Sequence, residues 1–108
     1  MRRIIYSRAA LRKLESIHNY ISEALKSPKA ATRVAESIIY HISLLKEGPF
    51  IGPKLSSQID RVPERFLETR FLICDKHIIV YEPKETEVMV LAIYHSSEDV
   101  FGRILSEL

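Results

Sequence analysis

The side chains with the greatest chemical potential lie in the C-terminal half of this sequence, around two apolar runs separated by a polar turn. Residues 77–99 read HIIVYEPKETEVMVLAIYHSSED, with a histidine opening the first run and another closing the second. A cation, a general base and a proton donor, the groups that acid–base catalysis combines, could all come from this region. The four candidates are Arg70, His77, Tyr81 and His95.

Whether these four side chains meet depends on the parity of the strands that carry them. A tight two-residue turn before His77 places Arg70 opposite Tyr81. Arg70, His77 and Tyr81 then share one face of the sheet. His95 joins that face if Tyr81 pairs with Met89, whereas a slip of one residue sends His95 to the other face.

The polar cluster at residues 95–99 is interpreted as the junction between the last strand and a final short helix. Ser97 is expected to cap that helix, with Glu98 and Asp99 in its first turn, where negative charge is favourable. A Ser-His-Asp triad fits poorly, because the residues are consecutive and no nucleophile elbow precedes them. A metal site would lack a second histidine at helical spacing, so His95 is the catalytic candidate of this cluster.

Length and composition are those of a single globular domain spanning residues 1–108. The chain is 46% apolar and 28% charged, which is ordinary for such a domain. Its longest apolar run, 88–94, is far below the roughly 20 residues that span a bilayer, and no secretory signal is expected. Cys74, the single cysteine, permits no disulfide within the chain and fits a reducing cytosol. No phosphate loop, nucleotide fingerprint or metal cluster occurs, so no cofactor is expected.

The net charge of +2 is unevenly distributed along the chain. Residues 1–54 contain ten lysines and arginines against four acidic residues, whereas residues 55–108 contain six against ten. The basic half could attract nucleic acid or an acidic protein partner. A solvated helix surface would have the same composition, so the charge alone does not choose a partner.

The N-terminal half predicts a short strand followed by two antiparallel helices. Residues 3–6 are rich in β-branched and aromatic side chains, and Ser7 can cap a helix over 8–25. Ser27-Pro28 begins the second helix, since proline is tolerated in a first turn, and Gly48-Pro49 ends it. Apolar side chains recur at three- and four-residue steps in both helices. The short connection makes the pair a helical hairpin.

The C-terminal half predicts a loop, a three-stranded meander and the final helix. In the loop, residues 47–64, we expect Phe50, Ile51 and Leu55 to pack against the core. Strands are expected at 66–74, 77–82 and about 88–95. The fold class is therefore α+β, in the order β-α-α-β-β-β-α: a helical hairpin packed on one face of a small antiparallel sheet, whose second face is partly open.

Nearly the full length of the chain resembles the RelE/ParE superfamily of bacterial toxins. The resemblance rests on YSRAALRKLESIHNYI after a short strand, a second helix ending in LKEGPFIGPKL, and then HIIVYEP and VMVLAIYHSSED. It implies a cytoplasmic, growth-arresting toxin of a type II toxin–antitoxin module, of the kind associated with plasmid stabilization. It also implies a small cognate antitoxin that wraps the toxin and usually represses their shared operon.

Two activities occur in that superfamily, and a few positions discriminate between them. RelE-like members enter the ribosomal A site and cut mRNA, for which a base must take the 2′-hydroxyl proton and cations must stabilise the phosphorane. Those members usually carry one arginine where this chain has Ile78 and another where it has Ser97 or Glu98. Phe101 stands nearest to their C-terminal tyrosine and cannot donate a proton. An apolar residue at the first position is more similar to the ParE-type branch, which is associated with inhibition of DNA gyrase.

Three hypotheses follow from the sequence. The first is a ParE-like toxin that binds DNA gyrase partly through its last helix and the strand before it. The second is an endoribonuclease acting on the ribosome and mRNA, in which the four candidate residues do the chemistry and Lys54 and Arg65 contact RNA phosphates. The third is a homologue that binds the antitoxin but has lost toxicity. The two missing arginines favour the first and third hypotheses.

Overall fold

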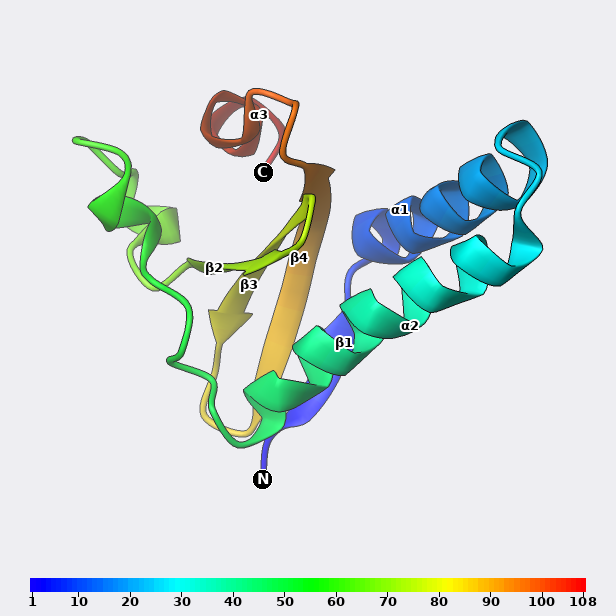
Figure 1. Cartoon of the computed structure of the whole chain (residues 1–108). Coiled ribbons are helices and arrows are strands. Elements are labelled where there is room, and N and C mark those ends of the chain that lie inside the picture. Colours follow the sequence, from blue (N-terminus) through cyan, green and yellow to red (C-terminus); the bar gives the residue numbers. More distant parts are fainter.

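Seven helices and strands follow one another in the predicted order in the computed structural model, which describes all of residues 1–108 (Figure 1). They are β1 (Arg3–Tyr6), α1 (Arg8–Asn19), α2 (Pro28–Ser43), β2 (Arg70–Cys74), β3 (His77–Pro83), β4 (Glu87–His95) and α3 (Val100–Glu107). The strand order in the sheet is β1-β4-β3-β2. The meander β2-β3-β4 is antiparallel, as predicted. β1 instead runs parallel to β4, so the sheet is mixed rather than wholly antiparallel.

Ser7 connects the first strand, the first helix and the middle of β4. Its side chain accepts a hydrogen bond from the backbone N–H of Ala10 at 3.0 Å, which caps α1 as predicted. The same hydroxyl donates to the carbonyl oxygen of Leu91 at 2.7 Å. One short side chain therefore fixes the start of the helix against the sheet.

The helical hairpin closes through an unusual turn. A π-helical segment, Tyr20–Ala24, continues α1, and Lys26 then adopts a left-handed backbone conformation with φ of 53°. The N–H of Ser27 reaches back six residues to the carbonyl of Ile21 at 3.2 Å, one residue further than the long hydrogen bond of a Schellman helix end. Ser27 also caps α2 through the N–H of Ala30, and Pro28 occupies the first turn, as predicted.

Both faces of the sheet carry packed elements, and the second face stays partly open, as expected: Ile73 of β2 lies on that face and is 62% exposed. The helical hairpin packs on one face through eight buried side chains: Ala10, Ile17, Ile38, Ile42, Cys74, Ile79, Val90 and Ile93. On the other face, α3 and the preceding long loop bury a second set: Leu55, Phe66, Phe71, Val80, Ala92, Tyr94, Val100 and Ile104. Figure 1 shows the two helices on one side of β4 and α3 with the loop on the other.

The long loop forms the edge of the domain beside β2. Its segment 53–55 lies against the start of β2, where the N–H of Leu55 donates to the carbonyl of Thr69 at 2.9 Å. Leu55 is fully buried, as predicted, but Phe50 and Ile51 are 58% and 55% exposed and do not pack into the core. β2 begins at residue 70 rather than 66, because a 3-10 turn, Glu64–Phe66, precedes it.

The last helix begins later than expected. Asp99, and not Ser97, is its N-cap, and the carboxylate of Asp99 accepts from the N–H of Gly102 at 3.4 Å. Glu98 lies in a turn outside the helix, where its N–H donates to the carbonyl of His95. Neither acidic residue therefore occupies the first helical turn. No helix in the structure combines the length and the apolar character that crossing a membrane requires.

Because Ser7 also bonds to β4, its removal should lower the free energy of unfolding more than the removal of an ordinary helix cap. Ser7→Ala removes the cap and leaves the Leu91 carbonyl without its donor, so we expect unfolding free energy to fall by about 2 kcal/mol. Ser27→Ala removes a cap alone and should cost about 1 kcal/mol. Urea denaturation of both variants measures the difference, and equal losses would show that the bond to Leu91 contributes nothing.

Candidate functional site

The four candidate residues share one face of the sheet, as strand parity predicts, but by a different register. Arg70 lies opposite Tyr81, as expected. Tyr81 pairs with Val90 and not with Met89, because β4 carries a bulge at that point. The extra residue in β4 shifts the alternation of its side chains by one. His95 therefore lies opposite His77 and on the same face.

The shared face is the one that the helical hairpin covers, and the candidates occupy its two opposite ends. Tyr81 follows His77 by four residues along β3, which corresponds to about 13 Å. Arg70 lies beside Tyr81 at one end, and His95 lies beside His77 at the other. The structure therefore brings the candidates together in two pairs. A single phosphate could not contact all four side chains in this arrangement.

The Arg70–Tyr81 pair holds the long loop in place. The N–H of Gly52 donates to the Tyr81 hydroxyl at 2.9 Å, and the Arg70 guanidinium donates to the carbonyl oxygens of Gly52 at 2.7 Å and Phe50 at 3.2 Å. Tyr81 is fully buried, and burial raises the pKa of its phenol. A Cβ at Gly52 would lie 2.2 Å from the carbonyl oxygen of Phe71, so only glycine fits there. Both candidate side chains are engaged in these internal contacts.

The two loop cations, Lys54 and Arg65, make contacts of their own. Lys54 Nζ lies 3.6 Å from a carboxylate oxygen of Glu68 in an exposed ion pair. The Arg65 guanidinium stacks over the Phe66 ring, 4.5 Å from its centroid. The backbone of Lys54 forms an isolated bridge with Arg70, so this lysine lies at the Arg70 end of the sheet.

The His77–His95 pair lies at the other end, beside the β2–β3 turn. The two rings contact edge to face, with centroids 5.4 Å apart. Nδ1 of His95 accepts from the N–H of Ser97 at 3.1 Å, which leaves the proton of the neutral ring on Nε2. Burial lowers the pKa of His77, and the neighbouring charges of His95 and Lys13 lower it further. The His77 ring is therefore neutral at pH 7.

This end of the sheet opens into a hollow of about 430 Å³ that the sequence analysis did not anticipate. It lies between the β2–β3 turn and α1, and Lys13 and Lys76 line it together with the two histidines. Helical spacing could have indicated Lys13, which precedes Ile17 by one turn on the buried face of α1. Lys76 could have been indicated by its place in the turn beside His77.

Glu98 ties three elements together at the rim of this end. Its carboxylate accepts from Lys13 Nζ of α1 at 3.1 Å and from the backbone N–H of His95 at 3.3 Å, and it pairs with Arg103 of α3. Partial burial raises the pKa of Glu98, but these hydrogen bonds and charges lower it overall. Through Glu98, the 95–99 cluster therefore fixes α1 and α3 to the end of β4. No group of three or more histidine, cysteine or acidic side chains is arranged to hold a metal ion.

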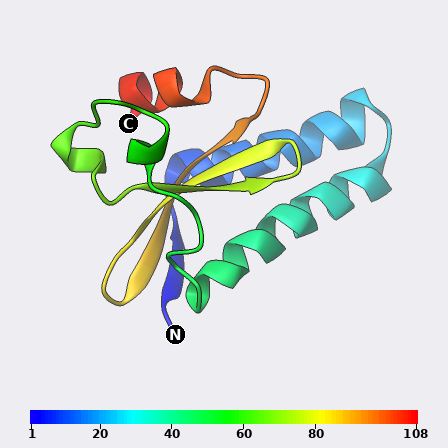
Figure 2. The ribbon, with the colours of Figure 1, turned by 60° about the vertical axis from the view of Figure 1, so that its left-hand side comes forward.

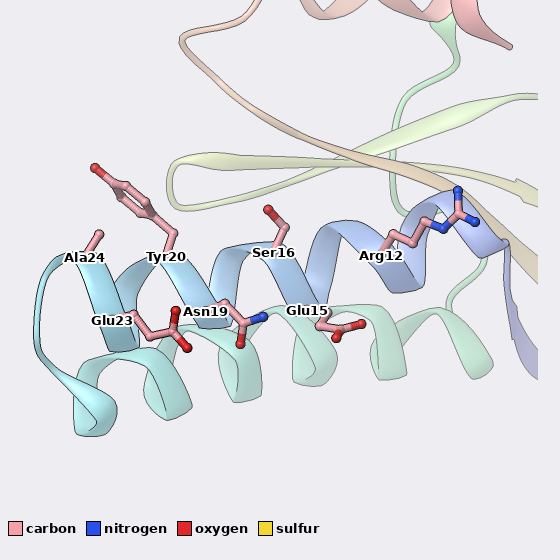
Figure 3. A pocket seen from close by; sticks show the side chains of 7 residues that line it. All are labelled: Arg12, Glu15, Ser16, Asn19, Tyr20, Glu23 and Ala24. Atoms are coloured by element: carbon pink, nitrogen blue, oxygen red, sulfur yellow. The ribbon is translucent and has the colours of Figure 1, made fainter.

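A hollow of about 560 Å³ along the outer surface of α1 is not a convincing active site. Figure 3 shows that its side chains come from a single stretch of helix and spread along its surface. They are Arg12, Glu15, Ser16, Asn19, Tyr20, Glu23 and Ala24. Because no second element supplies a facing group, nothing there converges on one reacting atom.

Comparison with known proteins identifies the family. The family model described as ParE toxin of type II toxin-antitoxin system, parDE, matches residues 4–100. Among solved structures, the chromosomal ParDE TA system from P. aeruginosa is similar, with a TM-score of 0.65 and 18% sequence identity over 88% of this chain and 96% of that one. At that identity the likeness concerns the fold. No curated protein sequence matches the chain significantly.

The internal hydrogen bond of Tyr81 predicts a structural phenotype for its removal. Tyr81→Phe leaves the buried Gly52 N–H without an acceptor, so the free energy of unfolding should fall by about 1–3 kcal/mol. Tyr40→Phe, at a tyrosine that is 60% exposed, should stay within about 0.5 kcal/mol of wild type. Urea denaturation distinguishes the two, and an unchanged stability of Tyr81→Phe would remove the proposed role of this tyrosine in holding the loop.

Proposed function

This chain belongs to the ParE toxin family of type II toxin–antitoxin systems, and we propose that it arrests growth in the cytoplasm by binding DNA gyrase until a cognate antitoxin neutralises it. The proposal assigns binding, rather than catalysis, as the toxic act. α3 and the end of β4 make part of the contact with gyrase in this proposal. The antitoxin covers the helical hairpin and the adjacent sheet edge.

The observation that carries the proposal is the separation of the four candidate catalytic residues. Cleavage of RNA through its 2′-hydroxyl needs a base, a cation and a proton donor around one phosphate. Here the cation and the phenol, Arg70 and Tyr81, are bonded to the long loop about 13 Å along the strand from the histidine pair. This arrangement supports a target-binding toxin over an mRNA endonuclease. The apolar Ile78, which replaces an arginine of the RelE-like pattern, supports the same choice.

The first experiment adds the purified protein to two reactions, supercoiling of relaxed plasmid by gyrase and cell-free translation with mapping of mRNA ends. We expect supercoiling to stop and the mRNA to remain intact. Ser106→Arg, a change on the exposed side of α3, should raise the inhibitory concentration roughly tenfold, equivalent to about 1.4 kcal/mol of binding. Thr32→Arg, an exposed change on α2, should leave the inhibition unchanged.

The remaining outcomes separate the other two hypotheses. Cuts in mRNA that require ribosomes and disappear in His95→Ala would identify an endoribonuclease and refute the proposal. Intact mRNA together with undisturbed supercoiling would identify a homologue without toxicity, provided that the protein still forms a complex with its antitoxin. The two reactions therefore discriminate among all three hypotheses.

An exposed apolar surface on the hairpin supports the antitoxin part of the proposal. Tyr40, Leu44 and Ile51 are 60%, 42% and 55% exposed at the C-terminal end of α2 and the start of the loop. Tyr40 and Leu44 are one helical turn apart, and the backbone N–H of Gly48 donates to the carbonyl of Leu44, which brings the loop alongside. Exposed apolar groups that gather in this way are typical of protein–protein contacts.

Charge introduced into that surface should weaken the toxin–antitoxin complex. Tyr40→Asp is expected to reduce affinity at least about tenfold, because an aspartate would have to be desolvated against an apolar partner surface. Leu67→Asp, at an exposed apolar side chain (49%) directly after the 3-10 turn Glu64–Phe66, serves as the control and should bind as wild type. Isothermal titration with the cognate antitoxin measures both. A complex insensitive to Tyr40→Asp places the antitoxin elsewhere.

A further inference from the structure

A groove opens where the helical hairpin extends beyond the sheet. Figure 2 shows the far half of α1 and α2 projecting past the strands, with the β2–β3 tip directed toward them. Two adjoining hollows, of about 430 Å³ and 460 Å³, form this groove and share Val34, Lys76 and His77. Each lies within the size range of small-ligand and side-chain pockets. We call the two hollows together the hairpin-tip groove, after the β2–β3 tip that borders them.

The floor of the hairpin-tip groove is aliphatic. Ile17, Ile21 and Val34 face it from the two helices, and Leu25 at the helix connection adds a side chain that is 58% exposed. Ile17 is largely buried in the core, whereas Ile21 and Val34 are only partly buried. An occupant with a branched aliphatic group would remove them from water, at about 25 cal/mol per Å² of apolar surface.

The rim carries an excess of nitrogen donors. Lys13, Lys76, His77 and His95 line the first hollow, and no aspartate or glutamate does. Asp75 is the one acidic residue in the second hollow. Lys13 is paired with Glu98, whereas the side chain of Lys76 has no ion pair and the His77 ring has no hydrogen bond. His95 keeps Nε2–H as a donor, because its Nδ1 accepts from Ser97.

We propose that the hairpin-tip groove binds an acidic peptide segment of a partner protein, with an aliphatic side chain on the floor and a neighbouring carboxylate held by Lys76 and the histidine pair. Charge complementarity selects an anion. The first hollow contains one exposed aromatic side chain, Tyr20, beside four aliphatic ones, which suits the mixed side chains of a peptide better than a run of stacked bases. The inference does not depend on gyrase being the cellular target, since it rests on the groove alone.

The histidine pair makes this binding dependent on pH. The charged or titratable groups that face His77 are His95 from β4, Lys13 from α1, Asp75 and Lys76 from the turn, and Glu98 beyond β4. In the free protein, burial and the adjacent cations lower the pKa of His77. A bound carboxylate would reverse the balance and favour the protonated ring. Proton uptake on binding means that affinity rises as pH falls.

The test measures fluorescence anisotropy of a labelled peptide, acetyl-Leu-Glu-Leu-Glu-Glu-amide, with the full-length protein. The control peptide is acetyl-Leu-Gln-Leu-Gln-Gln-amide, which keeps the aliphatic groups and lacks the charge. We expect the acidic peptide to bind, with affinity about tenfold higher near pH 6 than near pH 8, for one coupled proton. The amide peptide should bind at least about tenfold more weakly and without dependence on pH.

Variants assign the site. Lys76→Glu should abolish binding of the acidic peptide, whereas Lys29→Glu, the same charge change at an exposed residue outside the groove, should reduce it at most about twofold through long-range charge. His77→Gln should flatten the pH dependence, and His18→Gln should not. Equal affinities for the two peptides, equal losses in the two lysine variants, or preferential binding of a single-stranded oligonucleotide would each overturn the proposal.

Discussion

The bulge in β4 is the constraint on which the arrangement of this molecule depends. β4 is hydrogen-bonded on both sides, to β1 in parallel and to β3 in antiparallel. Before the bulge, Val88 and Val90 face the helical hairpin, and after it Ile93 does, which an unbroken alternation would forbid. Ser7 bonds to the carbonyl of Leu91 at this point and caps α1 with the same oxygen. The bulge, the helix start and the choice of face are thus one structural feature.

That feature decides where chemistry is possible on the sheet. Because the parity is reset, both histidines face the helices, and the opposite face is left to Ala92 and Tyr94, which pack under α3. At the Arg70 end, the helix face is closed by the loop that Tyr81 and Arg70 hold. At the histidine end, the helices overhang the strands and a hollow remains. One continuous face therefore contains a filled end and an accessible end.

The sequence predicts what local chemistry determines and misses what long-range pairing determines. Ser7, Ser27 and Pro28 identify the helix starts, because a cap acts within a few residues. The two-residue turn fixes the Arg70–Tyr81 register for the same reason. The bulge, the parallel pairing of β1 and the packing of α3 and the long loop on the second face depend on contacts between distant segments, which no local pattern encodes. The late start of α3 follows because Glu98 has partners on α1 and α3.

The candidate site shows what residue types can predict and what they cannot. An arginine, a tyrosine and two histidines on one sheet face have the composition of a nuclease site, and parity does place them on one face. Composition and parity do not fix position along the strand, and about 13 Å separates the two pairs. Arg70 and Tyr81 bond to the long loop at one end of the strands, and the two histidines line the open groove at the other. Because catalysis needs convergence on a single reacting atom, whereas recognition can be spread over a surface, this geometry is better suited to binding.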